Sequence, residues 1–490
     1  MAVAGVTEQR VAASVILTRG DGDDVEVYLV ERSKRLRFFG GYLAAPGGVL
    51  DDRDGSDLVV CALRELFEET GVLLSPVAQR IADDQRDSIR AALLDGGDER
   101  WETAVASAAG IGDRLEPLCV LTTPEFAQTR YEAHFFHAEL PRNEWPTIIE
   151  GELVDGAFCK PGEALRRWLE GELLIVPPML TLLRILDEAG PGGFYEQVAV
   201  EAKRYHEGEL HPVFFSPGVH MCALRTPTVP PATTTNTYLV GHRELWIVDP
   251  ATPDADEQAR LFDALDRYVD KGRELKGILV THHHEDHVGA VVPTSQRYGL
   301  DVHAHRLTLE RLPQGFLAGR ELNDGDTIEL GRAPDGAEDW RLEVLHTPGH
   351  DRGHLAFVET RYRAAVVGDL VSTVSTIVID PPEGHMTTYM RSLHRMLEVD
   401  IQTLYPAHGP AARDGHALLR DYITHRKDRE DKIVAALAVE PASLAALVAT
   451  VYDDVDPAVF GLAERSLLAG LIKLEEEGRA GQVGDAWVAT

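Results

Sequence analysis

The sequence predicts a multidomain protein of the α/β and α+β classes, and three observations support this prediction. The chain has 490 residues, too many for a single core, because domains average about 100–200 residues. Its composition of 44% hydrophobic and 26% charged residues is typical of globular proteins. Short β-branched runs alternate with helical apolar patterns along the chain. We therefore predict three domains, at residues 1–190, 194–430 and 431–490.

The first domain opens with two β-branched runs, VAASVILTR and VEVYLVERS, which are separated by the polar turn GDGDD. This pattern predicts a strand pair. Residues 58–70 follow a Gly- and Asp-rich loop and end before Gly71, which suits the left-handed position just past a helix. A later helical pattern stops at Gly190, ahead of a Pro-Gly-Gly segment, and this sets the predicted domain boundary.

The second and third domains differ in pattern. The apolar runs NTYLVG, ELWIVD and KGILVTH each lead into a polar or His-rich loop, as in layered α/β folds with sites at strand ends. After about residue 430 the pattern is helical, and the strand-like AWVAT follows near the end of the sequence. The order helix, helix, strand suits a winged-helix-like unit, although plain bundle packing explains the same apolar stripe.

The net charge of the chain disfavours nucleic acid as a partner. Lys and Arg number 48 and Asp and Glu number 80, giving a formal charge of −32, which opposes attraction to phosphate backbones. RNA stays an alternative partner because bound divalent cations or a local basic groove can receive a polyanion. Arg426, Lys427 and Arg429 offer such charges, but Asp428 and Glu430 interrupt them.

Cysteine usage and apolar runs point to a cytoplasmic protein. The four cysteines are widely spaced with no C-x-x-C pair, so we expect free thiols. The first residues lack a basic segment followed by an apolar one, and no run approaches the roughly 18 apolar residues of a membrane span. We expect no membrane association, and the oligomeric state is not predicted.

A histidine cluster follows the strand-like GILVT. It has the spacing H-x-H-x-D-H over residues 282–287, and alternate side chains of an extended backbone point the same way. His282 and His284 can therefore grip one ion while Asp286 and His287 turn toward a second. Imidazole and carboxylate donors suit zinc, with iron or manganese as alternatives.

Three further residues complete this set. They are His350 in TPGH, Asp369 in VVGD and His408 in YPAHGP, each beside a Gly or Pro that fixes a turn after an apolar strand. A lone histidine run is often a surface feature. The ordered set of five histidines and two aspartates favours a two-metal site.

This pattern resembles the metallo-β-lactamase superfamily over roughly residues 194–430. The resemblance implies an αββα sandwich and a metal-activated water, with Asp286 as the catalytic residue that orients or deprotonates it. It also implies that His282, His284 and His350 hold one metal, that Asp286, His287 and His408 hold the other, and that Asp369 bridges. His354, beside His350, is predicted to orient a ligand or to bind substrate.

Within the superfamily, the segments TNTYLVG, TPGHDRGH and YPAHGP are most similar to the beta-lactamase-like protein 2 group, with hydroxyacylglutathione hydrolases as near relatives. The first group resembles endoribonucleases acting on single-stranded RNA, and the second cleaves thioesters. A thioester, an ester or a phosphodiester therefore stays open as the substrate. The net charge favours a small molecule.

A second constellation lies in the first domain. The segment Pro46-Gly47-Gly48 is followed by RELFEETGV from Arg64. On a helix, Glu65, Glu68 and Glu69 lie at i, i+3 and i+4, so three carboxylates share one face. Hard oxygen ligands of this kind suit Mg²⁺ or Mn²⁺ bridging to a diphosphate.

This segment is similar to the Nudix box and matches its second half at every fixed position. The resemblance implies an α/β/α sandwich in which Glu65, Glu68 and Glu69 hold the metal and the latter two are catalytic. The first half departs: counting back from Arg64 puts Ser56 at the acidic position, whereas aligning on Gly48 puts Asp54 there. The residues assigned to substrate binding are Arg32, Arg37, Gly47, Gly48 and Arg64.

The preceding LVERSKRLRFFGGYLAAPGG partly resembles the coenzyme A diphosphatase signature. The implied substrate is a nucleoside diphosphate-linked molecule, with coenzyme A derivatives as one option. We thus predict a metallohydrolase with two active domains. Two alternatives stay open, namely a nuclease with a nucleotide-sensing front domain and a Nudix domain that binds a regulatory ligand without turnover.

Overall fold

The computed structural model describes residues 9–36, 39–74, 82–96, 115–124, 127 and 129–490. The chain forms two compact units, Thr7–Pro124 with Thr129–Glu209, and Leu210–Thr490. The four cysteines are free, as expected, with Cys61 and Cys222 buried.

The first unit is built on a seven-stranded mixed sheet. Its main order is β3-β2-β1-β6-β5, with β4 paired to β1 and β7 paired to β2. The predicted strand pair is confirmed as antiparallel β1 and β2, and β6 runs parallel to β1 on its other side. The strands are β1 (Arg10–Arg19), β2 (Glu26–Arg32), β3 (Leu43–Ala44), β4 (Gly47–Val49), β5 (Glu116–Thr122), β6 (Tyr131–Glu139) and β7 (Leu153–Cys159).

Helix α1 (Leu58–Thr70) forms where the sequence predicts it. The Asp57 side chain accepts hydrogen bonds from the first backbone N–H groups, and Gly71 ends the helix with a φ of 73°. Leu66 and Phe67 are buried in one core with residues of β1, which fixes the face that carries the glutamates. The other helices of the unit are α2 (Asp83–Leu94), α4 (Pro161–Leu169) and α5 (Pro177–His206).

The unit extends beyond the boundary predicted near residue 190. Gly190 leaves helical geometry, with φ 63° and ψ 176°, but α5 resumes immediately after it. Phe194 and Val198 are buried, and the compact unit ends only at Glu209. A single residue of broken geometry kinks a helix without ending the domain, because apolar residues beyond the kink still pack.

The second unit contains two sheets. The seven-stranded sheet has the order β14-β13-β12-β11-β10-β9-β8, and the five-stranded sheet has the order β15-β16-β17-β18-β19. The strands are β8 (Val213–Ser216), β9 (Val219–Arg225), β10 (Thr234–Gly241), β11 (Glu244–Val248), β12 (Glu274–Leu279), β13 (Asp301–Ala304), β14 (Leu317–Glu321), β15 (Thr327–Gly331), β16 (Trp340–His346), β17 (Leu355–Glu359), β18 (Ala364–Gly368) and β19 (Thr403–Pro406).

Helices cover both sheets, as the predicted αββα sandwich requires. Leu261 and Leu265 of α6 pack against the first sheet, and Tyr389 and Leu393 of α10 pack against the second. Between the sheets, the hydroxyl of Tyr238 donates to the carbonyl of Pro406 at 2.6 Å. The helices are α6 (Ala255–Asp270), α7 (Glu285–Val288), α8 (Val291–Tyr298), α9 (Arg306–Leu309), α10 (Met386–Leu397) and α11 (Gly415–Val439).

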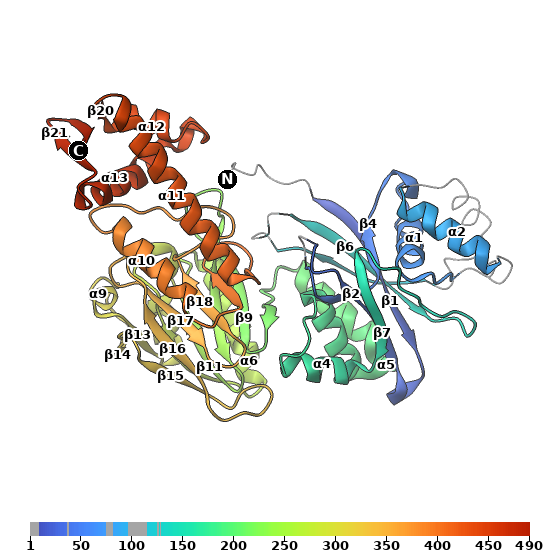
Figure 1. The fold of residues 1–490 in the computed structure, drawn as a ribbon. Helices are drawn as coiled ribbons and strands as arrows, with labels where there is room; N and C mark the ends of the chain where they lie inside the picture. The colour runs from blue at the N-terminus through green and yellow to red at the C-terminus, as the bar shows by residue number, and fades with distance from the viewer. Residues whose placement is uncertain (1–8, 37–38, 75–81, 97–114, 125–126, 128) are drawn as a thin grey trace. The chain divides into compact units, whose positions relative to one another are not determined.

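The boundary predicted at residue 430 falls inside α11, which continues unbroken from the sandwich into the C-terminal elements (Figure 1). These elements have a core of their own, which includes Leu467, Leu471 and Trp487. They are β20 (Ala442–Ser443), α12 (Leu444–Val451), α13 (Phe460–Glu476), β21 (Ala480–Val483) and β22 (Ala486–Ala489), with strand order β20-β22-β21. Among the described residues, every helix is too short or too polar to span a lipid bilayer.

Candidate metal centre

Loops at the ends of strands carry the seven predicted ligands. The histidine cluster begins three residues after β12, His350 lies between β16 and β17, Asp369 follows β18 directly, and His408 follows β19. These strands belong to both sheets of the sandwich. The structure brings all seven side chains together beyond the ends of these strands.

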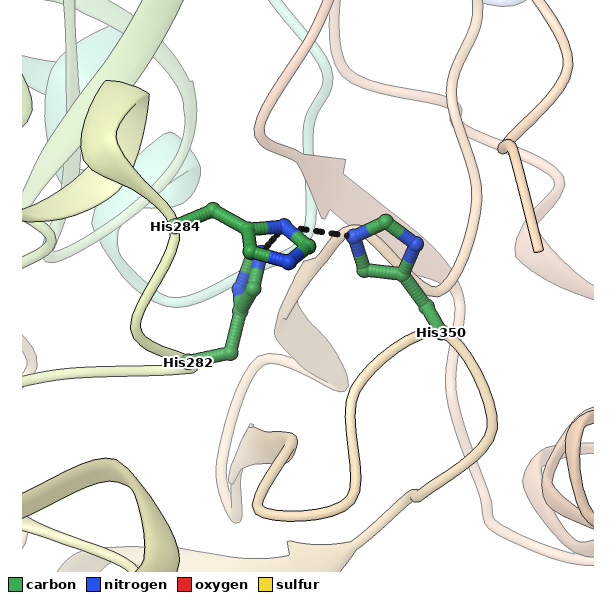
Figure 2. A group of neighbouring side chains, drawn as sticks. All are labelled: His282, His284 and His350. Carbon is green, nitrogen blue, oxygen red and sulfur yellow. Dashed lines mark hydrogen bonds between the residues drawn. The ribbon is translucent and has the colours of Figure 1, made fainter. Parts of the chain in front are cut away.

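Three histidines form the first cluster. The Nδ1 atom of His284 lies 3.0 Å from Nε2 of His282 and 3.0 Å from Nε2 of His350. Figure 2 shows the three rings facing one another from two separate loops. Their nitrogens are spaced so that one cation can contact all three.

Asp286, His287 and His408 form the second cluster. Asp369 contacts both clusters. Its Oδ1 lies 3.5 Å from Nε2 of His287 and 3.3 Å from Nε2 of His408, and its Oδ2 lies 3.5 Å from Nε2 of His350. This is the position that the bridging assignment requires.

Two buried atoms at the centre fit a metal. Nε2 of His287 and Oδ1 of Asp369 lack a hydrogen-bond partner among the described residues. A buried polar atom without a partner is costly, so an atom set of this kind favours a bound cation. Imidazole and carboxylate donors together suit zinc, iron or manganese.

Protonation of the two clusters differs. Burial lowers the pKa of His284 to about 4, and His350 adds to this shift, so the ring is neutral and offers its lone pair. Burial also lowers the pKa of His287, but the attraction of Asp369 and Asp286 outweighs it and raises the pKa well above its ordinary value. Asp369 and Asp286 thus favour a positive charge, either a proton or a cation, at the second cluster.

In the first unit, Arg64 and Asp54 form a buried bidentate pair. Nε and Nη2 of Arg64 donate to the two carboxylate oxygens of Asp54 at 2.7 and 2.8 Å. Asp54 therefore takes the acidic position that the sequence left open, and Ser56 is exposed. Every guanidinium nitrogen of Arg64 donates within the protein, so this side chain positions neighbouring acids, and contact of Arg64 with substrate stays a prediction.

The three glutamates follow on α1. Glu65 and Glu68 accept from Nη1 of Arg64 at 2.8 and 3.1 Å, and Glu69 accepts from the backbone N–H of Gly47 at 2.9 Å. Burial raises the pKa of Glu65 to about 7 and that of Glu69 to about 8. In the described part of the chain, their carboxylates do not converge as tightly as the ligand atoms of the second unit.

Models of known protein families match the parts of the chain that carry the two candidate sites. Residues 230–408 match the metallo-beta-lactamase superfamily, residues 443–487 match the beta-lactamase associated winged helix domain, and residues 8–132 match the NUDIX domain. The chain is a NUDIX domain fused to a metallo-beta-lactamase domain. The winged-helix interpretation of the C-terminal elements is thereby confirmed over plain bundle packing.

Curated relatives match the metallo-beta-lactamase domain. A hydroxyacylglutathione hydrolase of Rhodopseudomonas palustris is 36% identical over 131 residues, covering 26% of this chain and 46% of that protein. An atrochrysone carboxyl ACP thioesterase of Aspergillus fumigatus is 29% identical over 228 residues, covering 45% and 48%. The chain thus spans about half the length of these relatives. Homologues of beta-lactamase-like protein 2 match as well.

A solved structure shows the fold. A beta-lactamase domain protein from Burkholderia ambifaria has a TM-score of 0.50 at 19% identity, covering 57% of this chain and 93% of that one. At this identity the likeness concerns the fold alone. It confirms the sandwich predicted for the second unit.

The outer nitrogens of the metallo-beta-lactamase histidines are held by the protein. Nδ1 of His287 lies 2.9 Å from Oδ2 of Asp249, and Nδ1 of His408 lies 3.0 Å from the carbonyl of Thr234. Such contacts fix which nitrogen faces the metal. Sequence reasoning missed Asp249, although an acid directly after the buried strand in ELWIVD was an available signal.

His354 is buried beside Asp369. Its ring is fully buried, the backbone N–H of Asp369 donates to its Nε2 at 3.1 Å, and its Nδ1 lies 2.8 Å from Oγ1 of Thr347. Burial lowers its pKa to about 3, so the neutral ring can accept this hydrogen bond. The contact of His354 with the backbone of Asp369 fits the ligand-orienting option, and the substrate-binding option stays a prediction.

The glycines of the NUDIX domain allow close approach. A Cβ on Gly48 would lie 2.4 Å from the carboxylate of Glu65, and a Cβ on Gly47 would lie 2.4 Å from Oγ of Ser14. A Cβ on Gly47 would also lie 2.4 Å from the backbone oxygen of Ala13, so only glycine fits at that position. Contact of Gly47 and Gly48 with substrate stays a prediction. Arg32 lies close enough to Glu69 to oppose the rise of its pKa, and Arg37 lies outside the described residues.

Proposed function

We propose that the metallo-beta-lactamase domain hydrolyses an acyl thioester with a dinuclear metal centre. The observation that carries this proposal is the convergence of seven ligand side chains around Asp369. The substrate class is supported by the names of two relatives, a thioesterase and a hydroxyacylglutathione hydrolase. The formal charge of −32 also favours a small substrate over RNA.

The basic residues that an RNA groove would need do not support RNA as the substrate. Arg426 and Arg429 are buried and donate to the backbone carbonyls of Ile377 and Val451. They hold the fold together and add little positive charge to the surface. The RNA alternative therefore loses the local basic patch that it requires.

Each ligand has a proposed role. His282, His284 and His350 would hold one metal, and Asp286, His287 and His408 the other, with Asp369 shared. A bound metal pair supplies a water of lowered pKa and polarises the acyl carbonyl. Asp286 has a side chain that is 17% exposed against 10% for Asp369. It is the carboxylate better placed to accept the proton of the attacking water.

Asp286→Asn tests this assignment. We expect kcat/KM for a thioester panel of acyl-glutathione, acyl-coenzyme A and acyl-pantetheine to fall by about 10²–10⁴, because a proton acceptor is lost. Single-stranded RNA and a bis-phosphodiester complete the panel. Unchanged thioester hydrolysis, or faster cleavage of RNA than of every thioester by the wild-type chain, would contradict the proposal.

We further propose that the NUDIX domain hydrolyses a nucleoside diphosphate-linked substrate with Mg²⁺ or Mn²⁺. The supporting observation is the Arg64–Asp54 pair, which anchors the loop while Glu65, Glu68 and Glu69 share one face of α1. These three glutamates would hold the cation. Glu68 and Glu69 would be the catalytic pair, and a coenzyme A-type substrate is one option within this class.

Glu68→Gln separates catalysis from binding. In the full-length chain we expect loss of Mg²⁺-dependent release of a nucleotide from coenzyme A and other nucleoside diphosphate conjugates, with thioester hydrolysis unchanged. Calorimetry with the same conjugates provides the control. Tight binding with no turnover by the wild-type chain would instead identify a regulatory ligand-binding module.

A further inference from the structure

The loop between β18 and α10 supports a metal ligand. The carbonyl of Val378 lies 2.8 Å from Nδ1 of His350, which leaves Nε2 of that ring facing His284. The direction of the His350 ring therefore depends on where this carbonyl lies. We call residues 377–380 the support segment.

Helices α11 and α13 hold the support segment on both sides of Val378. The guanidinium of Arg426 on α11 donates to the carbonyl of Ile377. The backbone N–H of Ile379 donates to Oγ of Ser466 on α13 at 3.3 Å. The carbonyl that orients His350 is thus fixed by a side chain of the winged-helix domain and by one from the helix that leads into it.

Further contacts tie α13 to the same loop. Arg465 forms an ion pair with Asp380 at 2.8 Å. Glu476 lies 2.7 Å from Nε2 of His385, and it accepts from Oγ1 of Thr387 at 2.6 Å. The loop is therefore attached to α13 at both the support segment and the start of α10.

Arg426 also lies near the backbone that carries Asp369. Its guanidinium carbon is 5.4 Å from the ring centre of Tyr389, whose hydroxyl donates to the carbonyl of Leu370 at 2.7 Å. Arg426 is 7% exposed and Ser466 is 8% exposed, so neither contact is loosened by solvent. Buried hydrogen bonds to a backbone carbonyl are costly to remove.

We propose that Arg426 and Ser466 are positioning residues for His350, so that the site formed by His282, His284 and His350 depends on the C-terminal helices. The inference rests on the proposed dinuclear centre. We expect that removing the contact of Arg426 with Ile377, or that of Ser466 with Ile379, weakens metal binding at the first cluster and leaves metal binding at the second cluster unchanged. Residues that orient a metal ligand typically change metal affinity by about 10–100-fold.

The chain offers a matched pair of variants. Arg429 is one helical turn after Arg426 on α11, is 8% exposed, and donates to the carbonyl of Val451 and to Asp454, away from the support segment. The measurement is the number of Zn²⁺ ions retained by the full-length chain against increasing concentrations of a chelator. His350→Ala gives the reference for loss of the first position.

In Arg426→Met we expect one Zn²⁺ to be lost at a chelator concentration about 10–100-fold lower than in the wild type, with the second retained. Arg429→Met should keep both positions. Ser466→Ala should weaken the same position, and Ser466→Thr should restore it. If Arg426→Met does not fold, the serine pair decides the question.

Equal loss in Arg426→Met and Arg429→Met would overturn the inference, because it would indicate general destabilisation. Wild-type retention of both ions in Arg426→Met and Ser466→Ala would also overturn it. A wild-type chain that never holds two ions would instead contradict the proposed dinuclear centre. The two failures are therefore distinguishable without any substrate.

Discussion

The two candidate metal sites of this chain differ in how their ligand side chains are held and neutralised. In the metallo-beta-lactamase domain, histidine rings face one another and their outer nitrogens are held by Asp249, Val378 and Thr234. In the NUDIX domain, Glu65 and Glu68 are already paired with arginines. Glu68, for example, accepts from Arg64 at 3.1 Å and from Arg53 at 3.3 Å.

The chemistry of the donors explains this difference. Neutral imidazoles, such as His284 of the first cluster, do not repel one another, so hydrogen bonds can hold them around an ion position in advance. Buried carboxylates destabilise one another unless a proton or a cation neutralises them. The first histidine cluster is therefore preorganised, whereas the proposed glutamate site would exchange protons and arginine contacts for a metal.

His354→Ala tests whether a residue that contacts only the backbone of a ligand contributes to metal affinity. Because His354 accepts from the backbone of Asp369, we expect metal affinity of the metallo-beta-lactamase site to fall by about 10–100-fold and thioester hydrolysis to fall with it. Metal titration followed by kinetics measures both. His303→Ala is the control, since Nδ1 of His303 accepts from the backbone of Arg320 at 2.9 Å, away from the ligands.

If metal affinity is at the wild-type value in both His303→Ala and His354→Ala, the hydrogen bond from Asp369 to His354 is not needed to hold Asp369 in place. Diphosphate hydrolysis by the NUDIX domain should be unaffected in both variants. A loss there would point to instability of the whole chain.

A smaller effect is expected from pH at the NUDIX site. Since the pKa values of Glu65 and Glu69 are raised to about 7 and about 8, these carboxyls carry protons at pH 6 that a cation must displace. Mg²⁺ affinity should then rise by up to about tenfold per pH unit for each displaced proton and level off above about pH 8. Calorimetry in buffers of different ionisation enthalpy measures the proton release.

Glu69→Gln should reduce this pH dependence, because one displaced proton is removed. A Mg²⁺ affinity that is flat between pH 6 and pH 8 would contradict the proposed exchange of protons for metal. Binding of Mg²⁺ would then involve no release of protons from Glu65 and Glu69.

The sequence predicted much of the fold and the ligand set. The strand pair and the helix from residue 58 to residue 70 follow from local patterns, the seven ligands follow from their order after apolar strands, and the sandwich follows from the family resemblance that these ligands carry. Alternation of side chains and the turns beside Gly and Pro are local properties. They can therefore be read without knowing how distant parts of the chain pack.

Other features depend on long-range packing and could not be read in this way. Asp54 was distinguished from Ser56 only by its pairing with Arg64. The role of His354 depends on the backbone of Asp369, and that of Val378 depends on its carbonyl, to which any residue type contributes equally. Gly190 gave the signal of a domain end, but burial of Phe194 keeps the following residues in the first unit.

The metal content of the purified full-length chain, compared with Asp369→Ala, tests the central claim most directly. We predict two transition-metal ions per wild-type chain, one located by anomalous diffraction at each of the two clusters. In Asp369→Ala we predict that both positions weaken and that thioester hydrolysis is lost while the NUDIX activity remains. Absence of metal at this place in the wild type, or full occupancy and full thioester hydrolysis in the variant, would contradict the account.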